Sequence, residues 1–224
     1  MQEQKNVFRS FRTEADTQLL HINRIDPVHV IDEGQKTSIT IVFEPLGINH
    51  FFSESLSGII ATAGNEYSYI DISRYSFLGF ADLVFQSTDT AEQLELIERF
   101  LVRKFCAQET PFLEEAISLL TDFDQIRTIP EICNQICTSP RNLSRLFNKH
   151  TGLSPVEFRN ISQFRFSLHK KMESGSKALK DISYESNYSD ASYMVRTYRK
   201  YTGLNPSSFF DKITVESNYV FLAL

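Results

Sequence analysis

The spacing of hydrophobic residues changes along this chain of 224 residues. Between about residues 19 and 52, turn-forming residues interrupt β-branched and aromatic residues. Within that stretch, residues 37–43 (TSITIVF) alternate between apolar and polar positions as a strand does. Residues 89–105 have helical spacing instead, with apolar positions at Leu94, Ile97, Leu101 and Phe105. These patterns predict an α+β module over residues 1–110.

From residue 111 onward the apolar spacing is helical almost to the end of the chain. It predicts a short helix near residues 130–137 and a longer helix over residues 155–173. We therefore expect an all-α C-terminal domain over residues 111–213, followed by a tail at residues 214–224.

The helix expected between those two has clear signals at both ends. Ser139 can cap its first turn, Pro140 suits the first helical position, and Gly152 can take the left-handed conformation that ends it. The apolar residues on its inward side are Leu143, Leu146 and Phe147.

This layout occurs twice. Residues 130–139 (PEICNQICTS) correspond to residues 180–189 (KDISYESNYS) at an offset of 50, which pairs Ser139 with Ser189. Residues 147–158 (FNKHTGLSPVEF) correspond to residues 198–209 (YRKYTGLNPSSF) at an offset of 51. One residue is therefore inserted in the second turn.

Each copy reads as a short helix, a tight turn and a second helix with Arg and Lys on its outer face, which describes a helix-turn-helix. The two units cover about residues 130–152 and 180–203 and are joined by the helix at residues 155–173. That linker rises roughly 28 Å, and successive major grooves lie about 34–36 Å apart. The spacing is consistent with two recognition helices in adjacent major grooves of DNA.

Charge separates the two parts of the chain. The net charge is −5, but residues 1–124 hold 9 Lys and Arg against 20 Asp and Glu, and residues 125–213 hold 14 against 7. An acidic part joined to a basic part indicates modules with different partners, and the basic part suits double-stranded DNA.

The candidate DNA-binding residues are the polar, outward positions of the two second helices. Arg and Asn can make paired hydrogen bonds to guanine and adenine edges, whereas Lys149 and Lys200, one turn farther on, suit phosphates. The full set is Arg141, Asn142, Ser144, Arg145, Asn148, Lys149, Ser192, Tyr193, Val195, Arg196, Arg199 and Lys200.

Residues 128–213 resemble the AraC/XylS family of bacterial transcription regulators. The resemblance is carried by SPRNLSRLFNKHTGLSP and DISYESNYSDASYMVRTYRKYTGLNPSSF, in the order and spacing of that family. It implies a seven-helix, promoter-binding domain. The base-facing residues that it implies are Arg141, Ser144 and Arg145 in the first unit and Ser192, Val195 and Arg196 in the second.

The N-terminal part resembles the sensor half of a branch of the same family, through VFEPLGINHFF at residues 42–52. This second resemblance implies a regulatory module, and about 110 residues is short for the full β-barrel sensor. A small-molecule effector, a homodimer through this module and a contact with RNA polymerase follow only as family expectations.

The C-terminal match departs from the family pattern at several places. Asn187 and Tyr188 stand where Gly and Phe are usual before the second turn, and Val195 occupies a position where polar readers are common. We expect the first unit to read DNA sequence more sharply than the second.

Other classes of function lack support in the residues. The histidines are scattered and pair with no nucleophile, so no enzyme, catalytic residue or cofactor is predicted. Cys133 and Cys137 lie at i and i+4 without further ligands, which favours buried core thiols over a metal site. With three cysteines and no apolar run of membrane length, we expect a cytoplasmic bacterial protein and no membrane partner.

Two alternatives stay open. One is a helical protein-interaction adaptor with degenerate DNA binding, and the other is a regulator fused to a ligand-binding module of unknown chemistry. The sequence identifies neither the operator nor an effector, and it does not separate an activator from a repressor.

Overall fold

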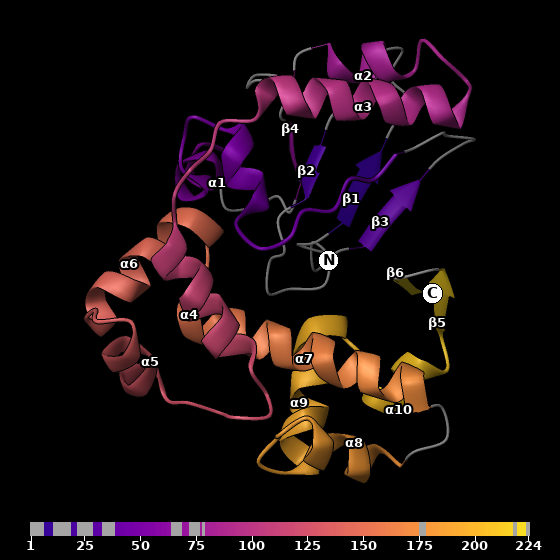
Figure 1. Cartoon of the computed structure of the whole chain (residues 1–224). Helices are drawn as coiled ribbons and strands as arrows, with labels where there is room; N and C mark the ends of the chain where they lie inside the picture. Colours follow the sequence, from indigo (N-terminus) through magenta and orange to yellow (C-terminus); the bar gives the residue numbers. More distant parts are fainter. Residues whose placement is uncertain are drawn as a thin grey trace. The chain divides into compact units, whose positions relative to one another are not determined.

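The computed structural model describes residues 7–10, 19–21, 29–32, 39–63, 69–71, 77, 79–174, 178–216 and 219–222 (Figure 1). Internal contacts divide the chain into two units. The first unit comprises residues 1–23, 28–118 and 129–155, and the second comprises residues 24–27, 119–128 and 156–224.

The first unit is built mainly from short helices. They are η1 (Gly47–Phe51), α1 (Leu56–Ala63), α2 (Phe80–Val84), α3 (Thr90–Lys104), most of α4 (Pro111–Thr121), α5 (Ile129–Gln135) and α6 (Pro140–Thr151). Asp89 caps α3 by accepting the Glu92 N–H at 3.1 Å. A core of aromatic and aliphatic side chains joins η1, α1 and α3, and its buried members are Phe52, Ile59, Phe77 and Phe100.

The prediction of an α+β N-terminal module is wrong. The described residues 39–63 and 79–104 contain no strand, and helices supply their core. Elsewhere, strands of three or four residues form isolated pairs. They are β1 (Val7–Ser10) with β3 (His29–Asp32), parallel, and two antiparallel pairs, β2 (Leu19–His21) with β4 (Tyr69–Asp71) and β5 (Ile213–Glu216) with β6 (Tyr219–Leu222). Parts of the expected β-rich stretch, residues 22–28 and 33–38, lie outside the described residues.

The alternating stretch at residues 39–43 shows why the strand prediction failed. Leu46 takes a left-handed conformation (φ 69°) that turns the backbone into η1, and no described strand runs beside residues 39–43. The Phe43 ring packs on Phe51 at 5.3 Å between ring centroids. Phe43 therefore packs on a helix rather than on a neighbouring strand, whereas Ile39 and Val42 of the same stretch are exposed.

In α3 the helix itself follows the sequence pattern, but the buried side differs. Ile97 and Phe100 are buried, whereas Leu94 and Phe105 are 61% and 53% exposed. Phe100 stacks on Phe80 at 4.3 Å and lies against Phe77 at 5.8 Å, and this aromatic cluster sets which face of α3 is buried.

The second unit contains α7 (Pro155–Ser174), α8 (Leu179–Glu185), α9 (Ala191–Thr202) and α10 (Pro206–Phe210). Its core is formed by Leu168, Ile182, Tyr188, Met194, Tyr198 and Phe209. The helical C-terminal part agrees with the pattern of residues 111–212. Within the described part of the chain, none of the helices combines the length and the apolar character that a membrane span needs.

Candidate nucleic-acid interface

Two helix-turn-helix units are present, α5 with α6 and α8 with α9 (Figure 1). Two positions after the end of each first helix stands a residue with a left-handed backbone, Cys137 (φ 52°) after α5 and Asn187 (φ 57°) after α8, 50 positions apart. Each second helix begins at a capping side chain. Ser139 accepts the Asn142 N–H at 3.2 Å, and Asp190 accepts the Tyr193 N–H at 2.7 Å.

These caps show where the extra residue of the second helix-turn-helix, α8 with α9, lies. Only Thr138 stands between Cys137 and Ser139, whereas both Tyr188 and Ser189 stand between the corresponding residues of the second unit. The counterpart of Ser139 is thus Asp190, and its expected pairing with Ser189 is wrong. The side chain of Tyr188 is buried, so the added length supplies a core residue.

The repeated Thr-Gly-Leu sequence ends the second helix of both helix-turn-helix units, α6 and α9, in the same way. Gly152 and Gly203 have φ of 72° and 75°, which favours glycine, and each N–H bonds back into its helix. Thr151 Oγ1 donates to the Phe147 carbonyl and Thr202 Oγ1 to the Tyr198 carbonyl, both at 2.7 Å. The Thr-Gly-Leu sequences therefore have a structural role, because they fix the ends of α6 and α9.

The two second helices bury equivalent faces. Leu143 and Phe147 of α6 are fully buried and Leu146 is half-buried; Met194 and Tyr198 of α9 are buried as expected. Nine of the twelve predicted DNA-binding residues are exposed: Arg141, Ser144, Arg145, Asn148, Lys149, Ser192, Arg196, Arg199 and Lys200. The other three, Asn142, Tyr193 and Val195, are half-buried.

Two of the half-buried residues contact an arginine one turn farther along their helix. Asn142 Oδ1 accepts a hydrogen bond from Arg145 Nη2 at 2.9 Å. The guanidinium carbon of Arg196 lies 5.6 Å from the centroid of the Tyr193 ring, a cation–π contact. The sequence alone did not show whether Asn142 and Tyr193 contact an arginine of their own helix or a DNA base.

The charges at the two helix starts differ. The Tyr193 N–H, with smaller contributions from Ser189 and from the charge of Arg196, holds the pKa of Asp190 below its usual value. Asp190 is therefore ionised at neutral pH, whereas its counterpart Ser139 is neutral. At the far end of α6, burial is the main cause and Lys149 a further cause of a lowered pKa for His150.

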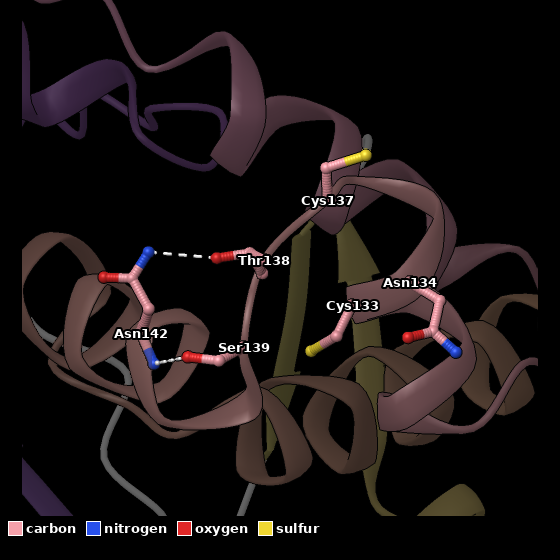
Figure 2. Close-up of a pocket in the computed structure, with 6 residues that line it drawn as sticks. All are labelled: Cys133, Asn134, Cys137, Thr138, Ser139 and Asn142. Carbon is pink, nitrogen blue, oxygen red and sulfur yellow. Dashed lines mark hydrogen bonds between the residues drawn. The ribbon is translucent and has the colours of Figure 1, made fainter.

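A shallow depression lies at the turn of the first unit, lined by Cys133, Asn134, Cys137, Thr138, Ser139 and Asn142 (Figure 2). Cys133 is buried, as expected, and burial raises the pKa of its thiol. Cys137 is exposed, so the expectation of a core thiol is wrong there, because its left-handed turn position lies at the surface. The described residues contain no group of three His, Cys, Asp or Glu side chains able to hold a metal ion.

The repeated caps, buried faces and basic outer faces define a tandem helix-turn-helix protein of the DNA-binding class. Residues 132–212 match the family model of a helix-turn-helix domain, which is of the AraC type. Residues 132–212 therefore form a DNA-binding domain of the AraC type.

Comparison with solved structures finds ToxT from Vibrio cholerae O395, with 17% identity, 59% of this chain and 54% of that chain covered, and a TM-score of 0.42. It also finds an AraC-type regulator from Chromobacterium violaceum, with 22% identity, 44% and 88% covered, and a TM-score of 0.40. A ToxT structure with an unsaturated fatty acid bound has 18% identity, 60% and 51% covered, and a TM-score of 0.39. The chain spans about half the length of ToxT, and no curated protein matches it.

Proposed function

We propose that this protein binds promoter DNA with α6 and α9 as recognition helices, placed in adjacent major grooves. The observation that carries the proposal is the exact repetition of cap, basic position and helix stop at an offset of 51: Ser139 and Asp190, Arg145 and Arg196, Lys149 and Lys200, Gly152 and Gly203. A major groove admits one helix with its polar face toward the bases.

The helix α7 suits this arrangement in length. Its 20 residues rise about 30 Å, close to the roughly 34–36 Å between successive major grooves on one face of DNA. One chain would then recognise two half-sites that other helix-turn-helix proteins recognise as dimers. The twelve outward residues of α6 and α9 named above are the proposed contacts.

The decisive experiment is a binding-site selection with the full chain at two salt concentrations. We expect two conserved half-sites with centres about 10–10.5 base pairs apart and binding that weakens as salt rises. Arg145→Ala should relax base preference in one half-site and Arg196→Ala in the other, with the larger loss for Arg145. Binding that is absent or indifferent to salt would favour the protein-interaction adaptor instead.

The family consists of transcription regulators, which as a rule are not enzymes. As a regulator this protein would work on chromosomal DNA in the bacterial cytoplasm, beside RNA polymerase. A small-molecule effector acting through the N-terminal residues belongs to the same proposal. The test for an effector is a change in operator affinity in the presence of added ligands, a fatty acid among them.

The exposed apolar residues of α3 suit contact with a second copy of the chain. Leu94 and Val102 are 61% and 71% exposed on this helix. Glu92 lies in its first turn and Arg103 and Lys104 in its last, so two antiparallel copies would place opposite charges together. Sedimentation equilibrium should show a dimer that Val102→Glu dissociates, with Arg141→Glu as a control outside α3.

A further inference from the structure

The two recognition helices hold their central arginines by different contacts. Arg145 and Arg196 occupy the same position of the repeat, and each contacts the residue three positions earlier. That residue is an amide in α6 and an aromatic ring in α9. The difference decides how freely each guanidinium can turn.

In α6 the side-chain amide of Asn142 is bonded on both sides. Its Nδ2 donates to Thr138 Oγ1 at 3.0 Å, which directs Oδ1 toward Arg145 Nη2 at 2.9 Å (Figure 2 shows the Thr138 bond). The backbone N–H of Asn142 is also held, by Ser139 Oγ at 3.2 Å. An amide used in this way is not available for a paired contact with adenine.

Holding one nitrogen of Arg145 leaves the rest of its guanidinium fork free. A guanidinium has five N–H donors in a rigid plane, and two of them suffice for guanine O6 and N7. Fixing the plane before binding reduces the conformational entropy that DNA binding would otherwise remove.

In α9 the contact restrains Arg196 less. The face of the Tyr193 ring attracts the guanidinium but offers no acceptor that would orient its N–H groups. The ionised Asp190, at the start of the same helix, also attracts Arg196 and repels DNA phosphates.

We propose that Asn142 is a positioning residue that orients Arg145 for guanine, and that Tyr193 together with Asp190 leaves Arg196 a weaker reader. This inference rests on the proposed DNA binding. It changes the role of Asn142 from a base-reading residue to one that acts through Arg145.

The test compares affinities for the selected operator and for single-base variants of it, by fluorescence anisotropy with the full chain. Arg145→Ala identifies the base pair that Arg145 reads, with a loss of discrimination of roughly 5–150-fold. Asn142→Ala should lower discrimination at that same base pair about 5-fold or more and leave other base pairs unchanged. In the Arg145→Ala background it should have no further effect.

Two matched variants complete the experiment. Thr138→Val removes the acceptor that orients the Asn142 amide and should reduce discrimination at the same base pair. Asn134→Ala, an exposed residue that lines the same depression, should change nothing. Thermal denaturation of each variant separates these effects from unfolding, and Thr138→Val serves as the test if Asn142→Ala does not fold.

The second helix-turn-helix, α8 with α9, allows the reverse experiment, in which Arg196 is given the contacts of Arg145. Asp190→Ser together with Tyr193→Asn gives α9 the cap and the amide of α6, and should raise discrimination at the base pair read by Arg196 several-fold.

The outcomes separate this inference from the proposed function. If the wild-type chain selects no operator, the proposed function is wrong. If Arg145→Ala relaxes one base pair and Asn142→Ala does not, only the positioning role is wrong. If Asn142→Ala affects a different base pair, Asn142 reads DNA directly and the inference is overturned.

Discussion

At the scale of single residues, Ser167 organises the core of the second unit. It is fully buried, and its Oγ donates to the Phe164 carbonyl at 2.7 Å. Tyr198 OH lies 3.1 Å and Tyr188 OH 3.4 Å from the same oxygen. Because a hydroxyl has one proton and two lone pairs, both tyrosines donate to Ser167. Burial raises the pKa of Tyr198 to about 12, so this hydroxyl stays a neutral donor.

Ser167→Ala should therefore destabilise the second unit. It leaves two buried tyrosine hydroxyls without their acceptor, and an unsatisfied buried donor costs about 1–3 kcal/mol. Urea unfolding of the full chain measures the loss of unfolding free energy. Adding Tyr188→Phe removes one of the two unsatisfied donors and should recover part of the loss. A loss well below about 1 kcal/mol would contradict this role for Ser167.

At the scale of elements, the end of recognition helix α6 is held by the segment that contains η1 and α1. Asn49 is buried, and its Nδ2 donates to the His150 carbonyl at 2.9 Å and to the Leu46 carbonyl at 3.1 Å. Helix α1 packs against α6 (Figure 1). The last turn of α6 is thereby joined to residues more than one hundred positions earlier in the chain.

Asn49→Ala should lower the unfolding free energy by about 1–3 kcal/mol, because the part-buried His150 carbonyl loses its donor, whereas the Leu46 carbonyl keeps the Asn49 backbone N–H. Hydrogen exchange should show the loss of protection concentrated in the last turn of α6. Asn134→Ala, on the exposed side of α5, is the matched control and should change stability by less than about 0.5 kcal/mol. Equal effects of the two variants would show that the Asn49 bonds do not stabilise α6.

The two glycine stops provide a second comparison between equivalent elements. Both take a left-handed backbone, which costs a residue with a Cβ about 1–2 kcal/mol. A Cβ at Gly203 would meet nothing within 4 Å, but at Gly152 it would come within 2.4 Å of Ile60 Cδ1. Gly152→Ala should therefore lower the melting temperature at least as much as Gly203→Ala. Ile60→Val removes the obstructing methyl group and should reduce the amount by which Gly152→Ala lowers the melting temperature more than Gly203→Ala does. If that difference persists in the Ile60→Val background, the contact with Ile60 is not its cause.

The helix ends of the C-terminal part could be predicted because their signals are local. Pro140 and Gly152 specify their own backbone conformations, and Ser139 bonds to a residue three positions away. The strand expected over residues 37–43 is absent at the described residues 39–43. Its absence could not be predicted, because alternation alone does not show whether a partner strand exists. The hydrogen bond from Asn49 to the His150 carbonyl could not be predicted either, because the two residues are 101 positions apart. Asp190 as a cap was hidden because its neighbour Ser189 fitted the repeat equally well.

At the scale of the whole molecule, charge is divided along the chain. The basic residues 125–213 follow the acidic residues 1–124, so attraction to DNA comes from one part of the sequence. The acidic part opposes nonspecific binding to any polyanion. Specific binding then depends on the few cations that the recognition helices bring to phosphates.

This division predicts how salt changes operator binding. Each phosphate neutralised contributes about −0.9 to the slope of log K against log salt. Lys149→Ala and Lys200→Ala should each reduce the slope by about 1 and weaken binding alike for matched and mismatched sites. Lys104→Ala, an exposed cation on α3, is the control and should leave the slope unchanged. If Lys104→Ala changed the slope as much as Lys149→Ala, phosphate contacts would extend beyond the two helix-turn-helix units, and the assignment of DNA binding to α6 and α9 alone would be wrong.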